Sequence, residues 1–314
     1  MKHVLTARQF KTAELDDLFK RADYMRENSR TLTGRRRLMS SHNGLVLATM
    51  FYEPSTRTRL SFEFAAERLG ICVRGTENAA EFSSAAKGET IEDSTRVIAG
   101  YADIIVMRHK ENGAAERAAS VSDVPIINAG DGTGEHPTQS LLDVYTIKHE
   151  LGRLNDLEVV AMGDLKYGRT VRSLAQVLAM YPNNHVTFVS PKEMRIGDDI
   201  KQFLADRKVK FSETEDMYKV LAKTDVVYQT RVQKERHAAG KGAAPATGQD
   251  PRFVIGQKAL DKLKETAIIM HPLPRVTEIE TLVDADPRAA YFRQAENGLY
   301  MRMALLDALA GARR

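Results

Sequence analysis

Short apolar runs that alternate with amphipathic helices constrain the fold of this chain most strongly. Residues 44–51 form the first run, and its uniform hydrophobicity is typical of a parallel strand buried on both faces. Further strands are predicted at residues 71–74, 103–109, 125–128, 157–162, 186–189, 208–211, 225–228 and 267–270. Because the alternation restarts after residue 151, the sequence predicts an α/β protein. The chain is expected to form two doubly wound domains, each a parallel sheet flanked by helices. The active site is expected in the cleft between the two domains.

Helices are predicted where apolar residues recur with helical spacing. They span residues 12–27, 59–69, 90–98, 114–120, 136–151, 169–180 and 299–310. The basic run Arg35–Arg37 is interpreted as a solvated turn and residues 78–87 as a polar stretch, in which residues 83–88 are expected to form a flexible solvated loop. Residues 129–134 are predicted to form a glycine-rich loop, and residues 237–249 a long mobile loop.

The composition narrows the class of protein. With 314 residues, of which 43% are hydrophobic and 28% charged, the chain has the size and balance of a two-domain globular protein. Its net charge of +4 comes from dispersed residues without interleaved aromatics, so no nucleic-acid partner is expected. No run approaches the roughly 20 apolar residues of a membrane helix, so no membrane partner is expected. The single cysteine, Cys72, excludes an intramolecular disulfide and favours a cytoplasmic location.

Several kinds of catalytic chemistry lack their sequence motifs. The chain has no His/Cys cluster with zinc spacing, no HExxH, no P-loop and no GxSxG. In the glycine-rich loop, Pro137 stands where a dinucleotide fingerprint would have its third glycine. The sequence therefore predicts neither a metal nor a cofactor.

A cluster of hydroxyl and guanidinium groups follows the first predicted strand. Residues 55–59 read Ser-Thr-Arg-Thr-Arg, and they lie where Pro54 ends the strand and a helix begins. The free N–H groups and the dipole of a helix start favour an anion, and arginine forks suit phosphate oxygens. Ser55 or Thr56 can also cap the helix. This stretch predicts a phosphate site that uses neither a P-loop lysine nor a metal.

Polar clusters also follow other predicted strands, and in open parallel sheets ligands bind beyond the carboxyl ends of the strands. These clusters are Arg108–His109 and residues 130–139, 163–169, 229–236 and 271–275. Arg169 and Arg231 can each bind a carboxylate through two parallel hydrogen bonds, which fits a dicarboxylic substrate. His136 and Gln139 can hold a carbonyl or an amide. The prolines of residues 271–275 leave carbonyl groups able to accept from a substrate N–H.

Three motifs together resemble those of the aspartate/ornithine transcarbamoylase family. They are Ser55-Thr56-Arg57-Thr58-Arg59, His136-Pro137-Thr138-Gln139 and His271-Pro272-Leu273-Pro274. Ser83 with Lys87, residues 163–169 and residues 230–236 look like the catalytic chains of the aspartate-specific branch. The similarity runs in order over nearly the whole chain. An ornithine-specific enzyme would be expected to carry a Cys-Leu-Pro turn at residues 271–274 and to lack the arginines of residues 229–236.

The resemblance implies transfer of the carbamoyl group from carbamoyl phosphate to the α-amine of L-aspartate. The products would be N-carbamoyl-L-aspartate and phosphate, in de novo pyrimidine biosynthesis. It also implies a carbamoyl-phosphate-binding domain of residues 1–137, onto which a C-terminal helix of residues 297–314 packs, and an aspartate-binding domain of residues 138–296. The alternatives are carbamoylation of ornithine or another amino acid, and a catalytically silent phosphate-binding or scaffold subunit.

The resemblance assigns roles to individual residues. Catalytic roles are implied for Arg57, Thr58, Arg108, His136 and Lys87. Carbamoyl phosphate is expected to bind Ser55, Thr56, Arg57, Thr58, Arg108, His136, Gln139, Ser83 and Lys87. Aspartate is expected to bind Lys87, Arg169, Arg231, Gln233, Leu273 and Pro274. Glu53 is expected to pair with Arg169 and Arg236 when the two domains close.

Assembly follows from the same resemblance. Ser83 and Lys87 are similar to residues that a neighbouring subunit delivers, which implies a homotrimer with shared active sites. A regulatory chain or a dihydroorotase are further partners that the resemblance allows. We also predict that His136 is neutral and donates a hydrogen bond to the substrate.

Overall fold

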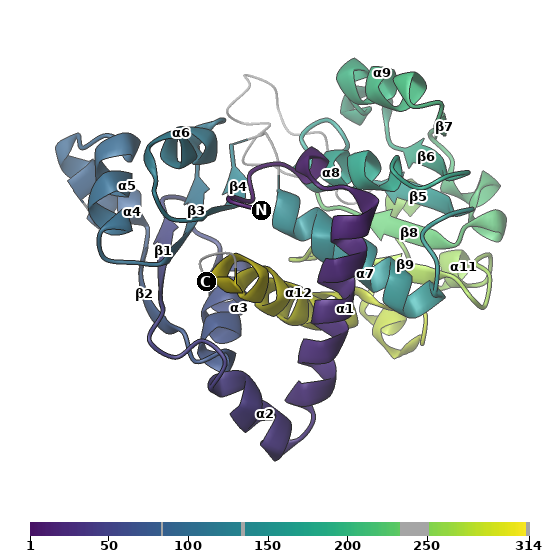
Figure 1. The fold of residues 1–314 in the computed structure, drawn as a ribbon. Coiled ribbons are helices and arrows are strands. Elements are labelled where there is room, and N and C mark those ends of the chain that lie inside the picture. Colours follow the sequence, from purple (N-terminus) through teal and green to yellow (C-terminus); the bar gives the residue numbers. More distant parts are fainter. Residues whose placement is uncertain (83, 133–135, 233–250, 312–314) are drawn as a thin grey trace. The chain divides into compact units, whose positions relative to one another are not determined.

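The computed structural model describes residues 1–82, 84–132, 136–232 and 251–311, and the chain divides into two compact units (Figure 1). Unit 1 comprises residues 1–142 and 296–314, and unit 2 comprises residues 143–295. The chain passes from one unit to the other within helix α7 (Pro137–Leu151) and again within helix α12 (Tyr291–Gly311).

Unit 1 is built on a parallel sheet with the strand order β2-β1-β3-β4. The strands are β1 (Val46–Phe51), β2 (Cys72–Glu77), β3 (Ile104–His109) and β4 (Ile126–Asp131). The inner strands are buried almost throughout, because helices cover both faces of a parallel sheet, whereas the edge strand β2 is largely exposed. From β1 the chain steps outward to β2 and then returns to β3 on the other side. The switch point of this sheet therefore lies between β1 and β3.

Unit 2 repeats this arrangement in a sheet of five parallel strands with the order β7-β6-β5-β8-β9. They are β5 (Glu158–Met162), β6 (His185–Val189), β7 (Lys210–Thr214), β8 (Val226–Gln229) and β9 (Ile268–Met270). The chain moves outward from β5 through β6 to β7 and then returns to β8 beside β5. The switch point of this second sheet lies between β5 and β8. Both sheets confirm the predicted α/β fold.

Helices flank the strands in both units. Unit 1 contains α1 (Thr12–Ser29), α2 (Leu32–Met39), α3 (Thr56–Arg68), α4 (Ala79–Phe82), α5 (Ile91–Ala99) and α6 (Ala114–Val121), with short 3-10 helices η1 (Ala7–Gln9) and η2 (Ser84–Lys87). Unit 2 contains α8 (Arg169–Leu178), α9 (Asp198–Asp206) and α11 (Gln257–Leu260). Its 3-10 helices are η3 (Lys192–Met194), η4 (Met217–Lys219), η5 (Leu221–Lys223), η7 (Pro251–Phe253) and η8 (Thr281–Ala285).

The last helix, α12, lies beside α1 in unit 1 (Figure 1). Arg26 of α1 donates to Asn297 Oδ1 at 2.7 Å and places its guanidinium over the ring of Tyr300. Farther along α12, Asp307 accepts from Arg21 at 2.6 Å. These contacts join the two ends of the chain within one unit.

Four local predictions differ from the structure. The basic run Arg35–Arg37 lies in helix α2, not in a turn, because Thr31 caps the helix and Gly34 and Leu38 are buried on one side of it. Residues 78–87 contain α4 and η2, so this polar stretch is helical in part. Strand β4 extends to Asp131 and takes up the start of the predicted glycine-rich loop. Helix α12 begins at Tyr291, well before the predicted start at residue 299. Helices α9 and α11 lie where no helix was predicted.

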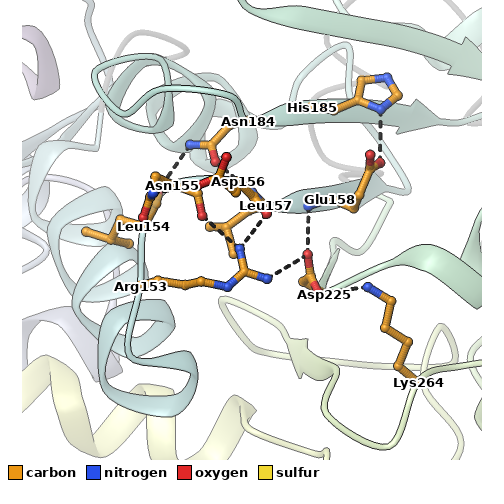
Figure 2. A network of polar contacts seen from close by, with 10 residues as sticks. All are labelled: Arg153, Leu154, Asn155, Asp156, Leu157, Glu158, Asn184, His185, Asp225 and Lys264. Carbon is orange, nitrogen blue, oxygen red and sulfur yellow. Dashed lines mark hydrogen bonds and ion pairs between the residues drawn. The ribbon is translucent and has the colours of Figure 1, made fainter.

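A polar network ties together the amino ends of β5 and β8 in unit 2 (Figure 2). Asp225 accepts from the Glu158 N–H at 2.9 Å, from Lys264 Nζ at 2.9 Å and from Arg153 Nη2 at 3.2 Å. Burial favours protonation of Asp225, but these hydrogen bonds outweigh it and lower the pKa of the carboxyl group. The network lies at the edge of the sheet opposite to the carboxyl ends of its strands.

No helix in the described part of the chain is long and apolar enough to cross a membrane.

Candidate active site

The start of α3 carries the predicted phosphate cluster of unit 1. Ser55 is the residue before the helix, and its side chain makes no capping hydrogen bond to the described chain, so the predicted cap by this hydroxyl is wrong. Thr56 and Arg57 form the exposed first turn, and Thr58 is buried. The helix start thus presents backbone N–H groups, hydroxyls and one guanidinium together, which suits an anion.

Arg59 differs from Arg57 although both belong to the same cluster. Its guanidinium donates to Glu63, one helical turn farther on, at 3.0 Å and to Glu77 of β2 at 3.0 Å. These two ion pairs occupy the fork of Arg59 within unit 1. Arg57, by contrast, lies exposed in the first turn of the helix.

Arg108 lies beside this helix start because of the strand register. The pairing of β1 with β3 places Arg108 opposite Phe51, the last residue of β1, and Tyr52 N donates to Arg108 O at 2.8 Å. The buried guanidinium donates to Glu53 Oε1 at 3.1 Å and to Ala129 O at 3.3 Å. Glu53 thus pairs with Arg108 inside unit 1, and Arg236, one of its two expected partners, lies outside the described residues.

His136 and Gln139 are positioned by the start of α7. The carbonyl of His136 accepts from the N–H groups of Gln139 at 3.0 Å and Ser140 at 3.2 Å, so His136 directly precedes the helix. Pro137 suits the first helical position, where no N–H is needed. The side chains of His136 and Gln139 are buried.

Strand order brings these groups of unit 1 to one edge. The residues follow or end β1, β3 and β4, which are adjacent, and parallel strands have their carboxyl ends at the same edge of a sheet. Ser55 to Thr58 and Arg108 flank the switch point between β1 and β3. Lys87 is exposed at the end of η2, which follows the edge strand β2, and Ser83 lies outside the described residues.

Arg169 occupies the corresponding place in unit 2. It is the first residue of α8, follows β5 through residues 163–168, and is buried. Gly163 has a φ of +112°, and a Cβ at this position would lie 2.2 Å from Thr230 O. Only glycine therefore allows β5 to leave the sheet so close to the end of β8.

Arg231 follows β8 on the other side of the same switch point. It is half-buried, and its Nη1 donates to Val232 O at 3.2 Å. A small open hollow at this edge is lined in part by Gly163, Thr230 and Glu278. Gln233 and the predicted loop of residues 237–249 lie outside the described residues.

Leu273 and Pro274 follow β9, which lies next to β8. The peptide between them is cis, and Leu273 has a φ of +54°. The Leu273 N–H donates to His271 Nδ1 at 2.8 Å, and His271 Nε2 lies 2.8 Å from Glu278 Oε1. The sequence predicted carbonyl acceptors in this turn but not the contact with Glu278, because no motif links Glu278 to His271.

Each unit can thus bind an anion at its own switch point. Unit 1 offers hydroxyls, a helix start and the guanidinium groups of Arg57 and Arg108, whereas unit 2 offers Arg169, Arg231 and two turn carbonyls. Among the described residues, no group of three or more His, Cys, Asp or Glu side chains is placed to hold a metal ion.

Comparison with known proteins gives matches over nearly the whole chain. The family model for the carbamoyl-P binding domain of aspartate/ornithine carbamoyltransferase matches residues 2–149, and the model for the Asp/Orn binding domain matches residues 155–309. The chain is 53% identical over 310 residues to the chloroplastic aspartate carbamoyltransferase of Oryza sativa subsp. japonica, and the match covers 98% of this chain and 84% of that protein.

Solved structures agree with this comparison. The catalytic subunit of M. jannaschii aspartate transcarbamoylase superposes with a TM-score of 0.90 at 44% identity, over 99% of each chain. Aspartate transcarbamoylase from Trypanosoma cruzi in complex with carbamoyl phosphate and aspartate gives a TM-score of 0.91 at 39% identity, over 98% of this chain and 96% of that one.

The names of the relatives bear on the predicted cytoplasmic location. The predicted cytoplasmic location is contradicted, because the relatives from rice and pea are named as chloroplastic proteins. Cysteine content reflects the redox state of a compartment and does not distinguish one reducing compartment from another.

Both domain models match, and several relatives exceed 50% identity. The chain therefore belongs to the aspartate/ornithine carbamoyltransferase family.

Proposed function

We propose that this chain is an aspartate carbamoyltransferase of de novo pyrimidine biosynthesis. It transfers the carbamoyl group of carbamoyl phosphate to the α-amine of L-aspartate and releases N-carbamoyl-L-aspartate and phosphate. Relatives over the whole chain carry this activity in their names. The observation that carries the proposal is the presence of guanidinium groups at the switch points of both sheets, since the reaction must hold two anions.

Unit 1 binds carbamoyl phosphate in this proposal. The first turn of α3 supplies N–H groups, the hydroxyls of Ser55, Thr56 and Thr58, and the guanidinium of Arg57 to the phosphate. Because Arg57 is exposed and Arg59 is engaged by Glu63 and Glu77, Arg57 is the phosphate ligand of the pair. Gln139, in the first turn of α7, holds the carbamoyl amide together with the carbonyl of Pro274.

The carbonyl oxygen of carbamoyl phosphate is polarised by Arg108, His136 and Thr58. Attack of the amine turns this oxygen into an oxyanion, and donors that are already in place stabilise it more than the ground state. Arg108 suits this role because Glu53 and Ala129 O already fix its guanidinium. His136, held at the start of α7, donates to the same oxygen as a neutral imidazole.

Unit 2 binds aspartate. Arg169 and Arg231 lie on the two sides of the β5/β8 switch point and bind the two carboxylates, with Gln233 as a further ligand. The Leu273 carbonyl accepts from the substrate. The positive charge of Lys87 attracts both anionic substrates. No side chain acts as a nucleophile, and the departing phosphate takes the proton of the amine. Bringing the amine and the carbonyl carbon together supplies much of the rate enhancement.

The proposed assembly is a homotrimer with shared active sites. Lys87 supports it, because this lysine is exposed at the end of a short helix that follows the edge strand β2 in the chain, where a second chain can receive it. In this arrangement Ser83 and Lys87 complete the site of a neighbouring subunit. Measuring the mass of the native assembly tests this arrangement: an active monomer would overturn it.

The reaction itself is tested with the purified chain and carbamoyl phosphate, using aspartate, ornithine and N-acetylornithine as acceptors. Phosphate should be released from carbamoyl phosphate only when aspartate is the acceptor. The Arg57→Ala variant should raise the KM for carbamoyl phosphate about 100-fold, since one charge-assisted contact is lost. The matched Arg59→Ala variant should change this KM by less than about threefold while lowering stability. Turnover with ornithine, or binding of carbamoyl phosphate without any turnover, would refute the proposal.

A further inference from the structure

The imidazole of His271 lies buried between the end of β9 and the turn of residues 272–274. Its Nδ1 accepts from the N–H of Leu273 at 2.8 Å. Its Nε2 lies 2.8 Å from Glu278 Oε1. Both ring nitrogens are therefore engaged within the turn, one by the backbone and one by a carboxylate.

These two contacts determine where the ring carries its proton. A backbone N–H can only donate, so Nδ1 of His271 must keep its lone pair. The proton of the neutral ring is then on Nε2, where it donates to Glu278. Burial lowers the pKa of His271 and outweighs the opposing effect of the Glu278 carboxylate, in agreement with a neutral ring.

Glu278 is itself held in place. Its Oε2 accepts from the N–H groups of Val276 at 3.2 Å and Thr277 at 3.0 Å. Burial raises the pKa of Glu278, but the hydrogen bonds from His271 and from backbone N–H groups outweigh it and lower the pKa. Glu278 is therefore a charged, fixed acceptor for the ring.

The backbone of His271 is anchored to the core of unit 2. Its N–H donates to Gln294 Oε1 at 2.8 Å, and Gln294 Nε2 donates to Asp143 Oδ1 at 2.7 Å. The hydroxyl of Tyr228 donates to the other oxygen of Asp143 at 2.7 Å. All four side chains are buried. Strand β8, helix α7 and helix α12 thus fix the position from which the imidazole reaches Leu273.

Leu273 requires such support. Its φ of +54° lies in the left-handed region, which is unfavourable for a residue with a bulky side chain. Residues held in such conformations cluster at functional sites, where the surrounding structure determines them. The hydrogen bond to His271 Nδ1 holds the N–H side of this residue.

We propose that His271 is a positioning residue for the amino-acid substrate, which acts by holding the Leu273 peptide through Nδ1. This inference rests on the proposed function, in which the carbonyls of Leu273 and Pro274 face the substrates. His271 itself touches no substrate. It sets the direction of the Leu273 carbonyl, while Glu278 selects the tautomer that leaves Nδ1 able to accept.

Unit 1 offers a matched control in His42. This buried imidazole also meets a carboxylate, with Nε2 2.8 Å from Asp307 Oδ1. Its Nδ1, however, has no hydrogen-bond partner among the residues that the structure describes. The same substitutions at His42 therefore remove a histidine–carboxylate pair without releasing a turn.

Two substitutions separate the functions of the two ring nitrogens. In His271→Gln the amide reaches the place of Nε2 and can donate to Glu278, but no acceptor remains for the Leu273 N–H. In His271→Asn the amide oxygen takes the place of Nδ1, and the donor to Glu278 is lost. We expect kcat/KM for aspartate to fall about 100-fold in His271→Gln and less than about tenfold in His271→Asn. The KM for carbamoyl phosphate should stay within about twofold in both.

The controls His42→Gln and His42→Asn should leave both kinetic constants within about twofold of wild type. Equal losses in the two His271 variants, or a smaller loss in His271→Gln, overturn the proposal. A wild-type chain that does not carbamoylate aspartate refutes the proposed function instead. If a His271 variant does not fold, ¹⁵N-histidine NMR of the wild-type protein decides: an unprotonated Nδ1 supports the proposal and a protonated Nδ1 overturns it.

Discussion

The two units present arginine at equivalent switch points but support it in different ways. In unit 1, Arg108 belongs to strand β3 itself, and Glu53 and Ala129 O hold its guanidinium. In unit 2, Arg169 is the first residue of a helix, and Arg231 follows a strand and donates to the neighbouring Val232 carbonyl. The donor of unit 1 is carried by a strand of the sheet, whereas the donors of unit 2 are carried by residues beyond the strands.

This difference indicates that the arginines of the two units act at different stages of the reaction. A donor fixed before the reaction suits charge that develops in the transition state, because little reorganisation is needed when the charge appears. Donors on the residues after a strand suit the carboxylates of a substrate that is charged throughout. Unit 1 should therefore act mainly on kcat, and unit 2 mainly on the KM for aspartate.

The largest effect is expected for Arg108→Ala. Loss of this donor should lower kcat about 1,000-fold, as for other groups that stabilise an oxyanion, and it leaves the Glu53 carboxylate without its partner. Steady-state kinetics with both substrates saturating measure the change. Arg108→Lys serves as control. Its kcat should lie between those of the wild type and Arg108→Ala, because lysine keeps the positive charge but lacks the forked guanidinium. A loss of less than tenfold in Arg108→Ala would remove the contrast between the units.

A smaller effect with a different signature is expected for Arg169→Ala. The KM for aspartate should rise about 100-fold through loss of a carboxylate contact, with the KM for carbamoyl phosphate nearly unchanged. Arg172→Ala is the matched control, since Arg172 lies in the same helix and pairs with Asp199. If the KM for carbamoyl phosphate rose instead, the assignment of the two substrates to the two units would be wrong.

The smallest effect concerns the acid stability of unit 2. Because the pKa of Asp225 is lowered in the folded protein, its contribution is present above a pH of about 4 and is lost as the pH falls through the folded pKa. Asp225→Asn should lower the midpoint of urea unfolding by about 0.5 M at pH 7, and this difference should vanish in acid. Asp198→Asn, at an exposed carboxylate, is the control. A difference that persisted at pH 3 would contradict the network in Figure 2.

Most of the fold could be predicted from the sequence because parallel strands buried on both faces are uniform apolar runs. All nine strands that the structure describes overlap predicted runs. Helix α2 was not predicted, because it has only two buried residues, Gly34 and Leu38, and the three arginines between them read as a polar link. Helix α9 carried a usable signal in Ile200 and Leu204, which are four residues apart and buried.

The site could be predicted in part, for a related reason. Clusters at helix starts, such as Ser55–Thr58, follow strands directly and are visible as local sequence patterns. The support of Leu273 was not visible, because it depends on a tautomer of His271 and on Glu278, Gln294 and Asp143. These partners come from separate elements and meet only in the folded unit. The pairing of Arg108 with Glu53 likewise depends on strand register.

The edge of the first sheet carries an exposed thiol. Strand β2 begins at Cys72, which is exposed and is the only cysteine in the sequence. A thiol-reactive fluorophore would therefore attach at one known position without any substitution. Its emission would report whatever covers that edge strand in solution, so the chain already contains the attachment point for a spectroscopic assay of its own association.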